Sequence, residues 1–143
     1  MLKMEIRIKK LVPGAVLPKK AHASDAGFDL VATSVGFEDG CWVCHTGLAF
    51  EIPDGYVGLV FPRSSIVKKD MSMANAVGVI DSNYRGEVTC RFRLAGMLEF
   101  PKYTAGERVA QMIIIPYPEV EFVESEELSE TDRGAGGYGS TGA

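Results

Sequence analysis

A strict period of two follows Gly86 in this sequence and limits what the chain can fold into. The apolar residues at every second position are Val88, Cys90, Phe92 and Leu94. Because successive side chains of a strand point to opposite faces of a sheet, the pattern predicts a strand with one buried face. Before it, an apolar run ends at Asp81, and residues 82–86 have the turn chemistry of Asn and Gly. Residues 77–88 are therefore predicted to form a β-hairpin. An ordinary surface hairpin, in which Asp81 serves only the turn, remains an alternative.

Short apolar runs of the same kind recur along the chain and predict an all-β domain. Pro53 and Gly55 separate two of these runs with turn chemistry, and Pro116 ends a third. A short helix is predicted for residues 64–69, after Pro62. The predicted strands are residues 2–9, 47–52, 56–61, 88–94 and 109–115, with 120–123 as a further candidate.

The composition is that of a soluble globular domain. The 143 residues are 46% hydrophobic and 24% charged, which suits about one domain with a real core. No apolar run approaches the about 20 residues that span a bilayer, and no secretory signal is expected. The net charge of -4 argues against binding to nucleic acid or acidic membranes. Three cysteines, an odd number, favour a reducing, cytoplasmic compartment.

The segment from Cys41 to His45 matches the pattern of covalent haem attachment. Haem attachment also needs export and a second axial ligand, and neither is indicated. Zinc needs four ligands, and only His22 and Cys90 could add to the segment. These residues are therefore predicted to be ordinary strand residues.

The C-terminal residues differ in character from the rest of the chain. An acidic stretch begins at Ser125 and leads into a Gly-rich tail that starts near Arg133. Such a tail cannot form a core, so the predicted organisation is a domain of residues 1–131 and a flexible lid of residues 132–143. A disordered terminus is the alternative. The Gly134-x-Gly136-x-x-Gly139 pattern has no helix after it, so it does not indicate a dinucleotide site.

Several polar groups along the chain suit a polyphosphate ligand. Arg63, Ser64 and Ser65 are donors for phosphate oxygens, and the Gln111 amide lies near a predicted strand start. The Asp29 carboxylate could hold a hydrated Mg²⁺. On the same hypothesis Asp81 is a candidate general base, Tyr84 offers a flat ring against which a sugar could pack, and the Tyr138 ring could cover a nucleobase.

The chain resembles the trimeric deoxyuridine triphosphatases (dUTPases) from about Ala21 to its C-terminus. Two departures from the family pattern are Tyr138, where Phe is usual, and Ser65-Ile66, where Gly-Leu is commoner. Five blocks carry the resemblance, in the family's order: Ala26-Gly-Phe-Asp-Leu30, Pro62-Arg-Ser-Ser65, Asn75-Ala-Val-Gly-Val-Ile-Asp-Ser-Asn-Tyr84 with Arg85-Gly86, Gly106-Glu-Arg-Val-Ala-Gln-Met112, and Arg133-Gly-Ala-Gly-Gly-Tyr-Gly-Ser-Thr-Gly142.

The resemblance implies a jelly-roll-like β-barrel subunit in a homotrimer with shared active sites. It implies hydrolysis of dUTP to dUMP and pyrophosphate with Mg²⁺, by in-line attack of a water on the α-phosphate. The product dUMP would supply thymidylate synthesis, and removal of dUTP would keep uracil out of DNA.

The resemblance also assigns roles to individual residues. Asp81 would activate the attacking water, Tyr84 would pack under the deoxyribose, and Asp29 would meet Mg²⁺ through water. Uracil would be bound by backbone groups around Val79, Ile80 and Thr89, and Asn75 and its neighbours would help to order the pocket. With Gly78, a further substrate-binding residue, these are the five predicted uracil residues. The phosphates would be held by Arg63, Ser64, Ser65 and Gln111. The tail would close the site from a neighbouring subunit with Arg133, Tyr138, Gly139, Ser140 and Thr141.

Two rival functions share the same fold. A dCTP deaminase-type relative would need a glutamate on the strand after the turn, and the position assigned to it holds Arg91. A non-catalytic regulatory trimer would need no base, so Asp81 together with Arg133 argues against it.

Overall fold

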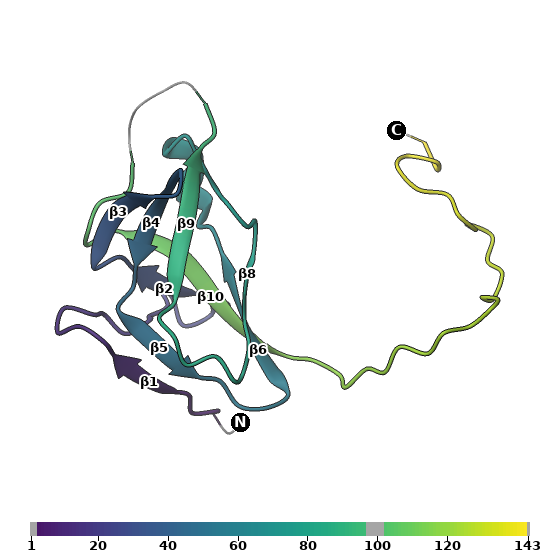
Figure 1. Cartoon of the computed structure of the whole chain (residues 1–143), viewed down its shortest axis with the longest axis horizontal. Coiled ribbons are helices and arrows are strands. Elements are labelled where there is room, and N and C mark those ends of the chain that lie inside the picture. Colours follow the sequence, from purple (N-terminus) through teal and green to yellow (C-terminus); the bar gives the residue numbers. More distant parts are fainter. Residues whose placement is uncertain (1–2, 97–101, 143) are drawn as a thin grey trace.

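Antiparallel strands make up most of the regular structure of the chain (Figure 1). The computed structural model describes residues 3–96 and 102–142. These residues contain ten strands and one short 3-10 helix, which confirms the predicted all-β class. In chain order the elements are β1 Arg7–Lys10, β2 Phe28–Val31, β3 Ser34–Glu38, β4 Cys41–His45, β5 Leu48–Glu51, β6 Tyr56–Phe61, η1 Ser64–Lys68, β7 Met71–Met73, β8 Gly78–Ile80, β9 Thr89–Leu94 and β10 Arg108–Pro116.

The strands form two four-stranded sheets and one pair. One large sheet has the order β2-β10-β6-β8, the other the order β3-β4-β9-β7, and β1 pairs with β5. The described strands thus lie in three separate sheets and do not close into one hydrogen-bonded barrel. The jelly-roll-like β-barrel expected from the sequence is therefore corrected to an open arrangement of three sheets, because β8 and β7 end their sheets as edge strands.

One apolar core joins the inner faces of the sheets. Phe92 of β9, Leu30 of β2 and Val109 of β10 are completely buried in it. The Phe92 ring lies 5.0 Å from the Tyr103 ring between centroids. Along β9, Cys90 and Phe92 point into the core while their neighbours are exposed, as the period of two predicts. Burial of this apolar surface supplies the main driving force that holds the sheets together.

The hairpin predicted for residues 77–88 is wrong. β8 pairs with β6, with Gly58 opposite Ile80, whereas β9 pairs with β4 and β7. The two arms therefore belong to different sheets, and residues 81–88 cross from one sheet to the other. The turn chemistry was identified correctly, but a turn does not determine which partner each arm finds across the core.

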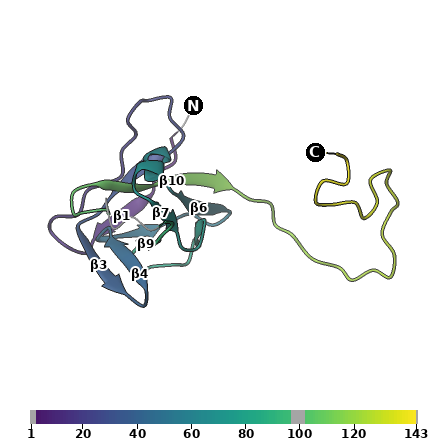
Figure 2. The same cartoon turned by 90° about the horizontal axis from the view of Figure 1, so that it is seen from above.

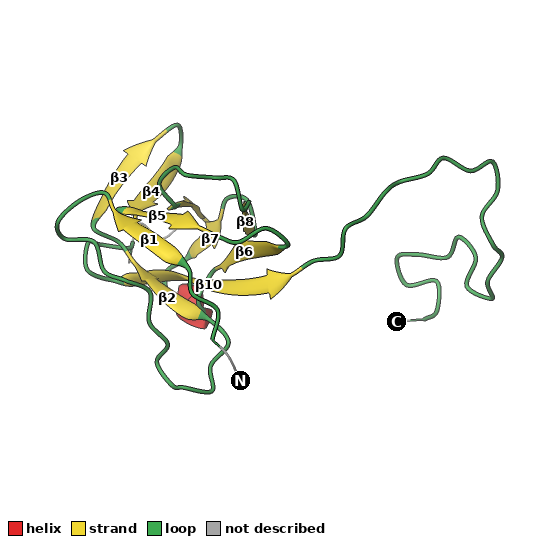
Figure 3. Cartoon of the chain, turned by 90° about the horizontal axis from the view of Figure 1, so that it is seen from below, coloured by secondary structure: helices red, strands yellow, loops and turns green. Residues whose placement is uncertain are grey.

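Three further predictions near the termini and in the middle meet different outcomes. Of the strand predicted for residues 2–9, only the part within β1 is seen, because β5 pairs with it at four positions. Leu2 lies outside the described residues. Residues 120–123 form no strand, because they lie in the stretch that leads away from the sheets after β10 (Figure 1). The short helix is confirmed as η1, drawn red in Figure 3.

Residues 117–142 contain no strand or helix and lead away from the sheets (Figures 1 and 2). Their apolar side chains are largely exposed: Phe122 is 97% exposed and Leu128 87%. The last strand, β10, ends at Pro116, and nothing in the structure tests the boundary predicted between residues 131 and 132. That boundary stays a prediction. Within residues 3–96 and 102–142, no helix has the length and apolar character needed to cross a membrane.

Candidate functional site

Asp81 lies directly after β8, where the chain leaves one sheet for the other. The Tyr84 amide donates to the Asp81 carbonyl at 3.1 Å, which closes a tight turn. A cavity of about 190 Å³ is lined by Asp81, Tyr84 and Glu87 among others, and a cavity of about 110 Å³ adjoins it. The residues predicted to bind uracil all line these two cavities: Asn75, Gly78, Val79, Ile80 and Thr89.

The Tyr84 ring folds back over the turn. Its hydroxyl donates to the Glu87 carbonyl at 2.9 Å. A Cβ placed at Gly86 would lie 2.5 Å from that hydroxyl, so only glycine allows the ring this position. Tyr84 therefore presents a ring of fixed orientation, 43% exposed, at the mouth of the cavity beside Asp81.

A second group of predicted residues gathers around Asp29 of β2. Arg63 donates from Nε to Asp29 Oδ1 at 3.0 Å, and Arg108 from Nη1 to Asp29 Oδ2 at 3.4 Å. Arg63 also donates to Ser65 Oγ at 3.3 Å. Ser64 begins η1 next to them. The two guanidinium groups and the hydroxyls form a cluster of donors suited to phosphate oxygens.

β10 explains why these residues meet. It lies between β2 and β6, and Gln111 is opposite both Asp29 and Phe61. The Gln111 amide donates to the Pro62 carbonyl at 3.1 Å and so holds the start of the Arg63 loop. Gly27 is required beside it, because a Cβ there would overlap the Gln111 side chain.

The Asp29 carboxylate fits an indirect role toward Mg²⁺. Among the described residues, no group of three or more His, Cys, Asp or Glu side chains could hold a metal ion directly. Mg²⁺ keeps several waters and is commonly bound through one carboxylate and substrate phosphates. Asp29 is 15% exposed at its side chain, and a carboxylate that accepts from two guanidinium groups can still accept from a water.

The two groups lie at opposite ends of β6. Ile80 is opposite Gly58, so Asp81 is level with Val57, whereas Arg63 follows the far end of the strand. Six residues separate Val57 from Arg63, about 20 Å at about 3.3 Å per residue. One copy of the chain therefore brings together the predicted base with the predicted uracil residues, and separately the predicted phosphate residues, but not both groups.

The tail residues of the prediction are not brought to either group. Tyr138 is fully exposed, and the tail leads away from the sheets (Figure 2). Arg133 donates from Nε to the Gly136 carbonyl at 2.9 Å, and the Gly134 amide donates to Thr131 Oγ1 at 3.1 Å, so both contacts stay within the tail. Gly139, Ser140 and Thr141 lie in a separate turn, where the Ser140 amide donates to the Gly137 carbonyl at 3.1 Å.

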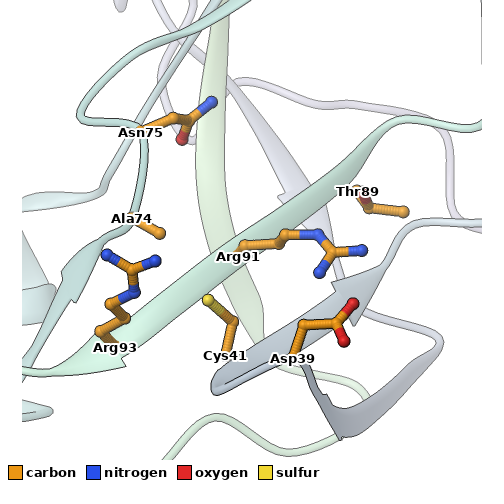
Figure 4. A pocket seen from close by; sticks show the side chains of 7 residues that line it. All are labelled: Asp39, Cys41, Ala74, Asn75, Thr89, Arg91 and Arg93. Atoms are coloured by element: carbon orange, nitrogen blue, oxygen red, sulfur yellow. The ribbon is translucent and has the colours of Figure 1, made fainter.

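A larger hollow of about 490 Å³ adjoins the uracil cavities and shares Asn75 and Thr89 with them (Figure 4). Arg91 and Arg93 of β9 line it, and Arg91 lies 3.8 Å from the Glu38 carboxylate. Arg91 occupies the position that a deaminase would need for its glutamate. No acid from β9 reaches this hollow, so its lining is basic on that strand.

Sequence reasoning missed two groups near the site. Arg108 belongs to a recognised block but was not assigned a contact, although it pairs with Asp29. Glu87 and His45 form a contact of 2.8 Å between Oε1 and Nδ1. They are 42 residues apart, and no local pattern links residues at such a separation.

The pKa values of two buried thiols and one carboxylate are shifted, and of these groups Cys90 lines the cavity of about 110 Å³. Burial raises the pKa of the Cys44 and Cys90 thiols to about 12 each, so these thiols stay protonated and inert. For Glu107, burial raises the pKa, but hydrogen bonds from Lys69 and Thr104 outweigh it and the pKa is lowered overall. The Lys69 ammonium lies 2.6 Å from Glu107 Oε1 and ties the loop before β10 to the end of η1.

Comparison with known proteins gives a consistent family assignment. Residues 14–142 match the dUTPase family model. A deoxyuridine 5'-triphosphate nucleotidohydrolase of Thermobifida fusca is 39% identical over 97% of this chain and 79% of its own length. The enzyme of the same name from Corynebacterium diphtheriae is 43% identical over 96% of this chain and 92% of its own length. Among solved structures, the Staphylococcus bacteriophage 80alpha dUTPase with dUPNHPP has a TM-score of 0.83 at 28% identity, and covers 99% of this chain and 100% of its own.

Proposed function

The chain belongs to the dUTPase family, and on that premise we propose that it hydrolyses dUTP to dUMP and pyrophosphate. The observation that carries the proposal is the position of Asp81, which lines one continuous set of cavities with all five predicted uracil residues. Relatives named deoxyuridine 5'-triphosphate nucleotidohydrolase over most of the chain support the substrate. The phage dUTPase with dUPNHPP, a dUTP analogue, supports it further.

In the proposed reaction Asp81 is the general base. It orients a water and accepts its proton while the water attacks the α-phosphate in line. Tyr84 supports the deoxyribose, and the backbone around Val79 and Ile80 binds uracil. Positioning of this kind supplies much of the rate enhancement in phosphoryl transfer, because the protein has little covalent chemistry to perform.

The cluster around Asp29 is proposed to hold the triphosphate. Arg63, Ser64, Ser65 and Gln111 would bind its oxygens. Asp29 would hold the water shell of Mg²⁺. When bound with the triphosphate, Mg²⁺ supplies neutralisation of the phosphate charge.

A homotrimer with shared active sites is part of the same proposal. The base and the phosphate residues lie about 20 Å apart along β6, further than a triphosphate that must meet both can span within one site. A second copy that places its Arg63 cluster beside the first copy's Asp81 removes this difficulty. The exposed apolar residues of the tail, among them Phe122 and Leu128, are also suited to contact another copy.

The tail is proposed to close over the bound nucleotide as a separate lid of residues 132–143. Arg133 would bind the γ-phosphate, and Tyr138 would stack on uracil. Gly139, Ser140 and Thr141 would add backbone and hydroxyl donors. The resemblance also implies that the product serves thymidylate synthesis and that dUTP removal keeps uracil out of DNA. The cytoplasmic location inferred from the three cysteines is part of the same proposal.

The rival functions receive less support. A dCTP deaminase needs an acid where this chain has Arg91, and Figure 4 shows that guanidinium group in the larger hollow, whose lining also includes Arg93 and one acid, Asp39. A non-catalytic trimer does not require Asp81 beside a nucleobase cavity.

Release of pyrophosphate from dUTP, UTP, dTTP and dCTP, each with and without Mg²⁺, tests the proposal. We expect release from dUTP with Mg²⁺ and much less from the other three nucleotides. Deamination of dCTP without pyrophosphate release would instead assign the deaminase function. No reaction with any of the four nucleotides would favour the non-catalytic binding protein.

A further inference from the structure

Glu87 is a carboxylate that holds the crossing loop to a different part of the chain. Its Oε2 accepts from the Gly47 amide at 2.8 Å, and its Oε1 lies 2.8 Å from His45 Nδ1. Because a carboxylate only accepts, His45 must carry its proton on Nδ1. Both oxygens of Glu87 therefore have a donor from the connection between β4 and β5.

This contact is more than an exposed ion pair. The side chains of His45 and Glu87 are 34% and 28% exposed, so solvent reaches both only in part. Two further hydrogen bonds lie beside it: the Thr46 side chain donates from Oγ1 to the Val88 carbonyl at 2.6 Å, and the Val88 amide donates to the Leu48 carbonyl at 2.9 Å. The segment from His45 to Leu48 thus holds residues 87–88 by several bonds at once, which fixes the end of the crossing loop.

The crossing loop, whose end at residues 87–88 is held in this way, also contains Tyr84. The Tyr84 hydroxyl donates to the Glu87 carbonyl, so the ring can keep its orientation only while the Glu87 backbone stays in place. Glu87 also lines the cavity beside Asp81. A shift of the Glu87 backbone would therefore move the Tyr84 ring, against which the sugar packs. Asp81, at the opposite end of the turn, would keep its position.

We propose that Glu87, held by His45 and the Gly47 amide, is a positioning residue that determines sugar specificity by fixing the Tyr84 ring. This inference rests on the proposed dUTP hydrolysis. A ring held at a fixed distance excludes a 2′-hydroxyl, whereas a ring free to move admits it. Loss of the Glu87 carboxylate should therefore cost discrimination between dUTP and UTP more than it costs turnover of dUTP.

The test compares five variants of the full-length protein: four single variants and the Glu87→Ala/His45→Ala double variant. Glu87→Ala removes both acceptors. Glu87→Gln keeps one acceptor for the Gly47 amide and a donor for His45, which can accept after a change of tautomer. His45→Ala removes one partner, and Glu38→Ala, which breaks an exposed ion pair with Arg91 beside the larger hollow and leaves His45 and Glu87 intact, is the matched control. For each variant, kcat and KM are measured with dUTP and with UTP, together with the melting temperature.

We expect Glu87→Ala to lower the ratio of kcat/KM for dUTP over UTP by at least about tenfold, mainly through KM for dUTP and a gain with UTP. His45→Ala should lower it in the same direction, and the double variant should do little more than Glu87→Ala alone, because the two residues act as a unit. Glu87→Gln should restore most of the ratio. Glu38→Ala should leave it unchanged.

An unchanged ratio in folded Glu87→Ala would overturn the inference. If Glu87→Ala does not fold, an unchanged ratio in His45→Ala overturns it. Hydrogen exchange of amides 82–88 tests the positioning step without turnover: exchange should be faster in His45→Ala than in the Glu38→Ala control, and equal rates contradict the inference. Wild-type protein that releases no pyrophosphate from dUTP would refute the proposed function, while this exchange result would still decide the positioning role.

Discussion

At the scale of single residues, the charged groups of the site lie in two places: the cluster around Asp29, and Asp81 beside the predicted uracil cavities. Asp29 and Arg63 neutralise each other in the absence of nucleotide, with Nε and Oδ1 3.0 Å apart. A phosphate must therefore compete with Asp29 for the guanidinium group, which favours nucleotides that bring a divalent cation for the carboxylate. Asp81 stands apart from this cluster, at the cavity that all five predicted uracil residues line.

Substitution of Asp81 tests its role as the base. Asp81→Asn keeps the size of the side chain but cannot accept a proton. We expect kcat for dUTP to fall by about 10²–10⁴, with binding of nucleotide largely kept. The control is Asp39→Asn, an exposed turn position with φ of 49° that asparagine tolerates. Turnover near that of the wild type in Asp81→Asn would remove Asp81 from the mechanism.

At the scale of elements, the sequence predicted the strands better than their partners. The β9 strand, the β6 strand and the short helix after Pro62 were predicted from period, turn and proline signals, which are local. The hairpin was wrong because β8 finds β6 across the core, and that choice depends on side chains far away in sequence. The contact between Glu87 and His45 was missed for the same reason. The phosphate residues were predicted from their hydrogen-bonding groups and from the resemblance to a family, not from periodicity.

The thiols of β4 and β9 give an element-scale prediction. Cys44 lies opposite Cys90 in the pairing of these strands, and both side chains are buried. The pKa of each is raised to about 12 from 9.0 by burial, so the unfolded chain loses these protons at lower pH than the folded chain does. The free energy of unfolding should therefore be unaffected by these thiols below pH 9.0 and should fall as pH rises from there toward 12.

A thiol reagent at neutral pH measures the same burial directly. The folded protein should show almost no reaction, and the protein in denaturant should show three reactive thiols, Cys41, Cys44 and Cys90. Rapid reaction of Cys44 or Cys90 in the folded protein would contradict the packing of the core between the sheets.

At the scale of the whole molecule, two features of the single chain bear on the proposed trimer. The proposed base and the proposed phosphate residues lie at opposite ends of β6, and the tail leads away from the sheets with its apolar residues exposed (Figure 1). Both features are explained if neighbouring copies complete one another's sites. In a cyclic trimer each interface then carries one complete site.

Truncation separates the role of the tail from that of the sheets. Deletion of residues 134–143 should leave the melting temperature and the oligomeric state unchanged, because the described core contains none of this segment. Turnover of dUTP should nevertheless fall steeply, since ordering a Gly-rich segment over the nucleotide excludes water from the site. Loss of folding would make the tail structural, and full turnover would make it dispensable.

Complementation between two inactive variants tests most directly the central claim that dUTP is hydrolysed at a site shared between copies. Asp81→Asn lacks the base, and Arg63→Ala lacks the main phosphate donor, so each alone should release little pyrophosphate. If the two residues of one site come from different copies, random co-assembly at equal amounts restores both in about one half times one half, or about a quarter, of the sites. We therefore predict release at about a quarter of the wild-type rate from the co-assembled mixture. Release no greater than that of the separate variants would place both residues of each site in one chain and contradict this account.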